Sequence, residues 1–182
     1  MKATGIVRRI DDLGRIVIPK EIRRTLHIRQ TDPLEIFTAQ NGEIILKKYS
    51  PIGELGDMAR QITDALAQTS GLTACVCDRD RIIAASGKYK KDLLGQEITV
   101  ELRQLISNRT GVTAQNTDKN FVIPVSTLSA KHFVGEVIFP ILAEGDTAGA
   151  VLLLSPESII CTDGDVKLTS AAALILGRQL ES

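Results

Sequence analysis

The fold of the first part of this chain is decided by residues 5–26, which read GIVRRIDDLGRIVIPKEIRRTL. Two short β-rich runs, 6–7 and 16–18, lie on either side of a turn in which Gly14 suits a position that requires a positive φ. Pro19 is favoured at the first position of a helix, where its missing N–H is not needed. The stretch therefore predicts two strands joined by a tight turn and followed by a short helix.

Two further strands are expected at residues 34–37 and 43–47, because Asn41-Gly42 between them is a strong hairpin signal. The order is β-β-α-β-β within fewer than 50 residues. The segment has no disulfide pair, no set of metal ligands and one phenylalanine, Phe37, so a single copy is too small to bury a stable core. We therefore expect residues 1–50 to form an obligate homodimer.

The formal charge of the chain is zero, but it is distributed unevenly. Residues 1–50 hold 10 Lys or Arg and 6 Asp or Glu, a net charge of +4, whereas residues 51–182 hold 12 and 16, a net charge of −4. This asymmetry predicts an anionic partner for the N-terminal segment. No long apolar run and no signal-peptide core occur, so we expect no membrane partner and a cytoplasmic location.

Basic side chains of the N-terminal segment indicate what the anionic partner is. In a helix after Pro19, Lys20, Arg24 and His27 share one face, with Arg23 beside them. Arginine presents a rigid fork of donors to phosphates and to guanine edges, so a face of this kind suits double-stranded DNA. The candidate DNA-binding residues are Arg8, Arg9, Arg15, Arg23 and Arg24.

A plainer interpretation of these arginines stays open. They can form a solvated surface with local ion pairs, for example between Arg15 and either Asp11 or Asp12.

Residues 4–48 closely resemble the AbrB-like family of swapped-hairpin transition-state regulators. The resemblance is carried by residues 4–9, 12–19, 21–26, 34–36 and 46–49. It implies that two chains interleave their hairpins into one β-barrel, in agreement with the size argument. It also implies DNA contacts by Arg8, Arg15, Arg23 and Arg24, with Arg9 as an additional contact. The sequence departs from many relatives at His27, where they have Gly, which leaves the local turn and any contact by His27 open.

The C-terminal segment, residues 51–182, is expected to be a second domain. It opens with a helix over 53–70 whose apolar stripe fits either a partner helix or the domain's own sheet. It closes with a helix over 163–181, capped by Asp163 or Asp165 and apolar on nearly every face, which predicts burial on more than one side. Between them the sequence predicts strands at 73–78, 82–85, 121–125, 135–142 and 148–154, a helical pattern at 90–109 and a polar loop at 110–120.

These features resemble a GAF domain, a sensor fold with a central antiparallel sheet. The fold class is therefore expected to be α+β, with a swapped-hairpin barrel followed by a GAF-like domain. We expect the helices 53–70 and 163–181 to pair dimers into a homotetramer, and an unidentified small molecule as a hypothetical ligand of this domain. Cys75 and Cys77 share a strand face and are expected in the core, and Cys161 is either a reactive or an inert loop thiol.

As a whole, the chain resembles AbrB-like regulators of sporulation, which implies a transcription regulator that acts as activator and repressor of sporulation genes. The alternative is an antitoxin-like or other protein-binding module that uses the same barrel. Antitoxin tails are polar and disordered, whereas residues 51–182 have the pattern of a folded domain. No catalytic Ser/His/Asp set, phosphate-cradling glycine loop or metal-spaced cluster occurs, so we expect neither an enzyme nor a cofactor or metal.

Overall fold

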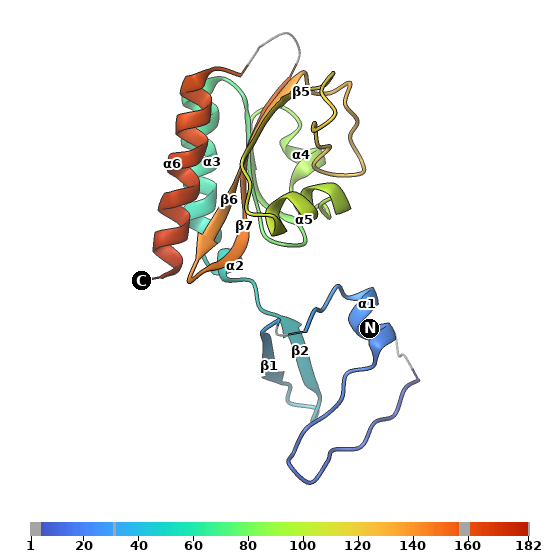
Figure 1. The fold of residues 1–182 in the computed structure, drawn as a ribbon. Coiled ribbons are helices and arrows are strands. Elements are labelled where there is room, and N and C mark those ends of the chain that lie inside the picture. Colours follow the sequence, from blue (N-terminus) through green and yellow to red (C-terminus); the bar gives the residue numbers. More distant parts are fainter. Residues whose placement is uncertain (1–4, 31, 157–160, 182) are drawn as a thin grey trace. The chain divides into compact units, whose positions relative to one another are not determined.

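The computed structural model describes residues 5–30, 32–156 and 161–181 (Figure 1). Contacts divide the chain into two compact units, one that ends at Tyr49 and one that begins at Ser50. We call the first unit the head and the second unit the body, and each is described by itself.

The head contains one short helix, α1 (Lys20–Thr25), and one hairpin of two strands, β1 (Leu34–Thr38) and β2 (Ile44–Lys48). The strands are antiparallel, and their connection is closed by a bond of 2.9 Å from the Ala39 N–H to the Glu43 carbonyl. Gly42 adopts a φ of 81° in this turn. The hairpin predicted from Asn41-Gly42 is confirmed.

The strands predicted at residues 6–7 and 16–18 are absent from this chain. Both stretches belong to two extended arms, 5–10 and 15–19, which are joined by the turn at 11–14 but form no ladder with any described strand. β1 and β2 already pair with each other within a two-stranded sheet. A β-rich arm without a neighbouring strand exposes unpaired N–H and C=O groups, so its regular structure depends on a partner.

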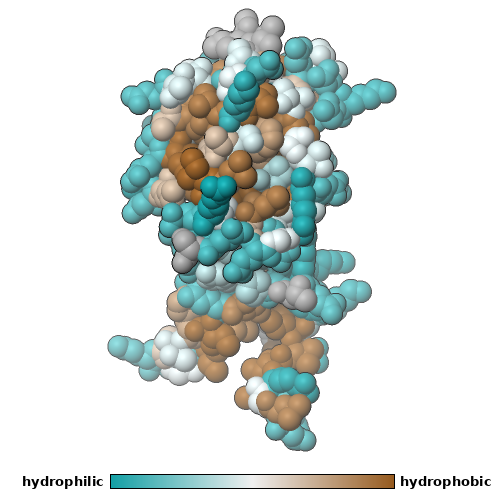
Figure 2. Space-filling model, turned by 60° about the vertical axis from the view of Figure 1, so that its left-hand side comes forward, coloured by the Kyte–Doolittle hydropathy of each residue, from teal (hydrophilic) through white to brown (hydrophobic). Residues whose placement is uncertain are grey.

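The head also lacks an apolar core of its own. Among the described residues of the head, Pro19 alone is buried, and the next buried residue along the chain is Ile52, which belongs to the body. Figure 2 shows apolar side chains crowding the surface of the head. The large apolar residues that are 36–89% exposed there are Ile6, Val7, Ile10, Leu13, Ile16, Val17, Leu26, Ile36, Phe37, Ile44 and Leu46.

The body is built on a five-stranded antiparallel sheet in the order β4-β3-β7-β6-β5. The strands are β3 (Thr73–Cys77), β4 (Ile82–Ser86), β5 (Val112–Gln115), β6 (Gly135–Ala143) and β7 (Asp146–Ser155). The helices α2 (Pro51–Glu54), α3 (Gly56–Ser70) and α6 (Asp163–Leu180) cover one face, and α4 (Lys90–Leu93) and α5 (Val100–Ser107) cover the other (Figure 1).

Each face of the sheet has its own apolar cluster, because successive side chains of a strand point to opposite faces. Val137 and Leu153 pack with the residues of α3 and α6, whereas Ile138 and Leu152 pack with those of α4 and α5. All four are fully buried. The body therefore closes a core on both faces without a second chain.

The first and last helices differ in detail from the prediction. The helix expected over 53–70 is divided at Leu55 into α2 and α3, and the buried residues Ala59 and Leu66 of α3 face its own domain's sheet. The N-cap of α6 is Thr162, whose hydroxyl accepts a hydrogen bond from the Asp165 N–H in a capping box, rather than Asp163 or Asp165.

The strand predicted over 121–125 is wrong, and the edge strand is β5, which lies inside the polar stretch predicted as a loop. Residues 121–125 are instead an irregular segment that packs Val122 and Val125 into the core beneath α5. An edge strand faces solvent along one side and keeps a polar composition. A run of apolar residues indicates that a segment is buried, but a buried segment need not pair with a neighbouring strand.

No helix in the described parts of the chain combines the length and the apolar character needed to cross a membrane.

Candidate nucleic-acid interface

The turn between the two arms is organised by the carboxylate of Asp11. Its Oδ1 accepts hydrogen bonds from the backbone N–H groups of Arg15 at 2.8 Å and Leu13 at 3.0 Å, and its Oδ2 accepts one from Arg15 Nε at 2.8 Å. The backbone and side-chain bonds from Arg15 lower the pKa of Asp11 below its ordinary value. Gly14, at a φ of 74°, lets the chain reverse. Asp11 therefore sets the direction of the Arg15 side chain.

The local ion pair weighed against DNA contact is thus present, and Asp11 rather than Asp12 is its acid. The bond uses Arg15 Nε, and the side chain is still 69% exposed. Its terminal nitrogens have no partner in residues 5–30, 32–156 or 161–181. Solvent screens an exposed pair of this kind, so it contributes little to stability and orients the guanidinium without occupying it.

Arg8 and Arg9 lie on the first arm, and both are exposed. Neither is paired with an acidic side chain in the part of the chain that the structure describes. Adjacent residues of an extended backbone direct their side chains to opposite sides, so Arg8 and Arg9 face different surroundings.

Arg23 and Arg24 lie in the last turn of α1, where positive charge is favourable to the helix dipole. Arg24 is exposed and Arg23 is half-buried. Pro19 is the N-cap rather than the first helical residue, and its carbonyl accepts a hydrogen bond of 3.0 Å from the Arg23 N–H.

His27 ends α1 instead of extending its basic face. The Ile28 N–H bonds to the Arg23 carbonyl at 2.7 Å and the His27 N–H bonds to the Arg24 carbonyl at 3.3 Å, the two bonds of a Schellman motif. His27 occupies the left-handed position with a φ of 51°, where glycine is usual. Its side chain therefore leaves the face that helical spacing assigned to it together with Lys20.

A buried ion pair that the sequence reasoning missed connects α1 with the hairpin. The Asp32 carboxylate, whose side chain is 3% exposed, accepts a hydrogen bond from the Arg29 N–H at 2.8 Å and lies 3.4 Å from Lys48 Nζ. Lys48 Nζ also donates to the His27 carbonyl at 3.1 Å. The only sequence signal for these contacts of Asp32 and Lys48 was the turn-forming pair Asp32-Pro33.

The five predicted arginines therefore lie on three pieces of the head, namely the first arm, the turn and α1. Only Arg15 has an acidic partner within the described ranges, and that contact leaves its outer donors available. Of the other four, Arg8, Arg9 and Arg24 are exposed and Arg23 is half-buried.

Two thiols of the body, those of Cys75 and Cys77, are buried, and that of Cys161 is half-buried. Burial raises the pKa of Cys75 to about 12 and also raises that of Cys77. Both lie in the core, as predicted. Burial raises the pKa of Cys161 to about 11, which favours the inert thiol. Among the residues with described positions, no three His, Cys, Asp or Glu side chains lie where they could hold a metal ion.

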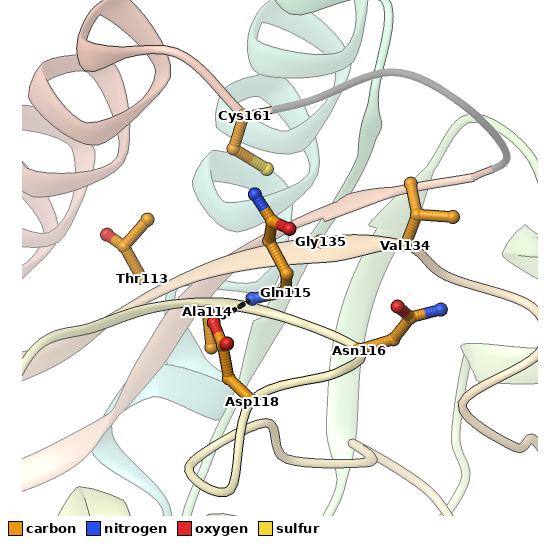
Figure 3. A pocket seen from close by; sticks show the side chains of 8 residues that line it. All are labelled: Thr113, Ala114, Gln115, Asn116, Asp118, Val134, Gly135 and Cys161. Atoms are coloured by element: carbon orange, nitrogen blue, oxygen red, sulfur yellow. Dashed lines mark hydrogen bonds between the residues drawn. The ribbon is translucent and has the colours of Figure 1, made fainter.

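One groove of the body, with a volume of about 360 Å³, lies at the ends of β5 and β6 (Figure 3). The amide of Gln115 points toward the thiol of Cys161 across the position where Gly135 has no side chain. Asp118, the one charged residue among the described lining residues, accepts a hydrogen bond of 2.8 Å from the Gln115 N–H. The groove therefore offers mainly neutral polar groups.

Two family models together cover most of the chain. The model of the stage V sporulation protein T C-terminal domain, a transcription factor, matches residues 54–181. The model of MazE, a bacterial antitoxin that recognises its toxin, matches residues 7–54.

Two proteins of Bacillus subtilis (strain 168) are similar in sequence. Stage V sporulation protein T is 49% identical over 183 residues, which is 100% of this chain and 99% of that protein. The transition state regulatory protein AbrB is 61% identical over 109 residues, which is 59% of this chain and 96% of that protein. The AbrB-like resemblance of the head is confirmed.

The body is similar in structure to the GAF domain of a phosphoenolpyruvate-protein phosphotransferase from Acinetobacter. The TM-score is 0.56 at 9% identity, over 69% of this chain and 81% of that chain. Identity at this level shows the fold alone, and the predicted α+β chain with a GAF-like body is confirmed.

Proposed function

The chain belongs to the family of stage V sporulation protein T, a family of transcription regulators, and we propose that paired heads bind double-stranded DNA. The contacts are made by Arg8, Arg9, Arg15, Arg23 and Arg24. The regulator both activates and represses sporulation genes. Its working location is on the DNA, in the cytoplasm.

The observation that carries the proposal is the incomplete head. Its two arms have no partner strand, and eleven of its large apolar side chains are exposed in the described chain. Burial of one such side chain contributes about 1.5–3 kcal/mol. Covering half of them against a second head therefore offsets an association cost of about 4–15 kcal/mol. Interleaved arms from two chains supply both the missing ladder and the missing core.

Pairing of the heads concentrates the arginines. Two copies place ten guanidinium groups on one barrel, and those without an acidic partner are ready to contact phosphates and base edges. Asp11 keeps Arg15 directed outward before DNA arrives, which reduces the conformational entropy lost on binding. If the barrel neutralises about eight phosphates, the logarithm of the affinity should fall against the logarithm of salt concentration with a slope near −7.

A salt titration tests this proposal. DNA fragments selected from a random pool by the full chain are titrated with that chain, by fluorescence anisotropy, at 50–300 mM KCl. We expect a slope near −7, and a slope near zero contradicts DNA binding by this surface. Arg15→Ala should weaken binding by about 1–3 kcal/mol and relax the preference at one base pair if Arg15 reads a base.

The matched control is Arg109→Ala. Arg109 belongs to the body, and its side chain is 54% exposed beside Asp146. Its replacement removes the same charge from the protein and should leave both the affinity and the slope unchanged. Equal losses for Arg15→Ala and Arg109→Ala would show that net charge, rather than the head surface, determines binding.

We propose further that the body pairs dimers into a tetramer through α6, together with the opening helices. α6 leaves Leu174 63% and Ile175 51% exposed, and Figure 2, turned to bring the α6 side forward, shows an apolar patch on the body. Leu174→Glu should convert four-chain particles into two-chain particles in sedimentation. Unchanged sedimentation would refute this interface. A small polar ligand in the groove beside Gln115 is the corresponding proposal for sensing.

The second candidate is an antitoxin-like protein-binding module, which the MazE match over residues 7–54 favours. The body argues against this module, because its sheet is covered on both faces by apolar clusters, as in a folded domain and unlike an extended tail. Limited proteolysis separates the two. Rapid loss of everything beyond Pro51 supports the tail, and a protease-resistant body supports the regulator.

A further inference from the structure

Glu136 is a carboxyl group in the interior of the body that the DNA-binding function does not use. It lies on β6, on the sheet face under α4 and α5, and is 0% exposed. Its Oε1 accepts a hydrogen bond of 2.7 Å from the Val122 N–H. Its Oε2 is buried and has no hydrogen-bond partner in the part of the chain that the structure describes.

The Val122 N–H belongs to the segment of residues 116–134, which we call the cover. The cover lacks strands and packs Val122, Leu128 and Phe133 onto the same sheet face. Thr99 also binds the cover: its hydroxyl donates to the carbonyl of residue 123 at 2.6 Å, and its N–H donates to the carbonyl of residue 124 at 3.0 Å. The hydrogen bond from the Val122 N–H to Glu136 joins the cover to a side chain of the sheet.

The neighbours of Glu136 cannot neutralise a negative charge. The strand partners opposite it are Ala114 of β5 and Leu154 of β7. Cys75 of β3 lies in the same cluster and stays neutral below pH 11, because burial raises the pKa of its thiol to about 12. On the opposite side, the Cys161 thiol feels the charges of Glu136 and Asp165, and both are negative when ionised.

The cover itself carries Asp118, Lys119, Lys131 and His132. Asp118 is bonded to the Gln115 N–H, and His132 lies against Tyr89 with 5.3 Å between ring centroids. No described ion pair joins any of these groups to Glu136, and the Arg103 guanidinium of α5 instead lies 3.8 Å from the Asp80 carboxylate. An ionised Glu136 would therefore be a buried charge with one hydrogen bond, which is unfavourable unless water reaches it.

We propose that Glu136 is a proton-operated latch, which holds the cover on the sheet when protonated and releases the cover when ionised. Burial raises the pKa of Glu136 from 4.5 to about 8 and outweighs the Val122 hydrogen bond, which lowers it, so the change falls close to neutral pH. The proton is the ligand of this site. The body thereby gains a conformational response to pH that is independent of DNA binding by the head.

The size of the response follows from the two pKa values. In the closed form the group titrates at about pH 8, and in an open, hydrated form near 4.5. Ionisation favours opening, so the ratio of open to closed should rise about tenfold per pH unit up to pH 8 and then level off. From pH 6 to pH 9 the total rise is roughly 100-fold.

Hydrogen exchange of the full chain, followed by mass spectrometry at pH 6–9 and corrected for the intrinsic exchange rate, tests the latch. Protection of the peptide 119–128 should fall roughly 100-fold from pH 6 to pH 9. In Glu136→Gln, which keeps the acceptor for Val122 but cannot ionise, protection should be constant. Constant protection in the wild type, or an equal fall in Glu136→Gln, overturns the proposal.

Two further measurements keep the test decisive. If the peptides 119–128 and 148–154 show equal protection at pH 9, the opening is global unfolding and the latch is refuted. A ¹³C NMR titration of the Glu136 carboxyl in the wild type needs no variant; a midpoint near pH 8 supports the latch, and one below about pH 5.5 overturns it. Cys161→Ser should leave this midpoint in place, since the thiol titrates near pH 11.

Discussion

Replacing Glu136 by Gln should remove a large part of the pH dependence of the body's stability. Burial raises the pKa of Glu136 in the folded state to about 8, above its ordinary value of 4.5. Between these values the folded state holds a proton that the unfolded state has released. The free energy of unfolding of the wild type therefore decreases as pH rises from about 4.5 to 8, and this contribution levels off above pH 8.

The magnitude follows from about 1.4 kcal/mol per pH unit. At pH 7 the wild type loses about 3 kcal/mol relative to pH 4.5 from this group, and above pH 8 the loss approaches about 4 kcal/mol. Gln keeps the oxygen that accepts the Val122 N–H, but it places an amide NH₂ where Oε2 has no partner. The protonated wild-type carboxyl also carries an unpaired O–H donor at this position, so the two stability curves should lie close together at pH 5 and diverge as pH rises.

Urea unfolding of the full chain at pH 5, 6, 7 and 8, followed by far-ultraviolet circular dichroism, measures the difference between the two proteins. The free energy of unfolding of Glu136→Gln, minus that of the wild type, should rise by about 1.4 kcal/mol per pH unit. A slope of zero would refute the burial argument, whatever the constant offset. Glu101→Gln, an exposed replacement on α5, is the control and should give no slope.

Four further changes test other contacts. Arg24→Ala should weaken DNA binding by about 1–3 kcal/mol, measured by anisotropy. Val17→Asp, at a side chain 70% exposed in one chain, should dissociate the paired heads in sedimentation, because the partner would have to bury the new charge. His27→Val should destabilise the head by about 1–2 kcal/mol at a φ of 51°, measured by urea unfolding. Gly149→Ala should destabilise the body by several kcal/mol in the same assay, because the new Cβ would overlap the Cys77 carbonyl oxygen.

Each of these changes has a control or a contradicting result. Lys91→Ala, on the exposed surface of α4, should leave DNA affinity unchanged. Gln40→Asp adds the same charge as Val17→Asp at the hairpin tip, and equal dissociation by both would argue against a specific interface. His27→Gly should be at least as stable as the wild type, since glycine accepts the left-handed conformation. An unaltered free energy of unfolding in urea for Gly149→Ala would contradict the close approach of the two strands.

Local signals in the sequence predicted much of the head and of the candidate site. Asn41-Gly42 placed the hairpin, Gly14 the turn and Pro19 the start of α1, because each residue type restricts φ within one or two positions. The split of charge singled out the arginines without knowledge of the fold. His27 was misplaced because helical spacing assumes that the helix continues, whereas the Schellman bonds had already ended it.

Length and composition alone were enough to predict that a head of this size needs a second chain, since its length limits the apolar surface that one copy can bury. It also determined that the head is basic and that the body is a folded domain. Three features became visible only in the folded chain: the arms lack partner strands, residues 121–125 belong to the cover rather than to a strand, and Glu136 is fully buried. Glu136 stands in a strand whose sequence does not distinguish its environment from that of an exposed acid. The difference arises because Val122, distant in sequence, covers it, and such long-range contacts decide whether a charge meets water.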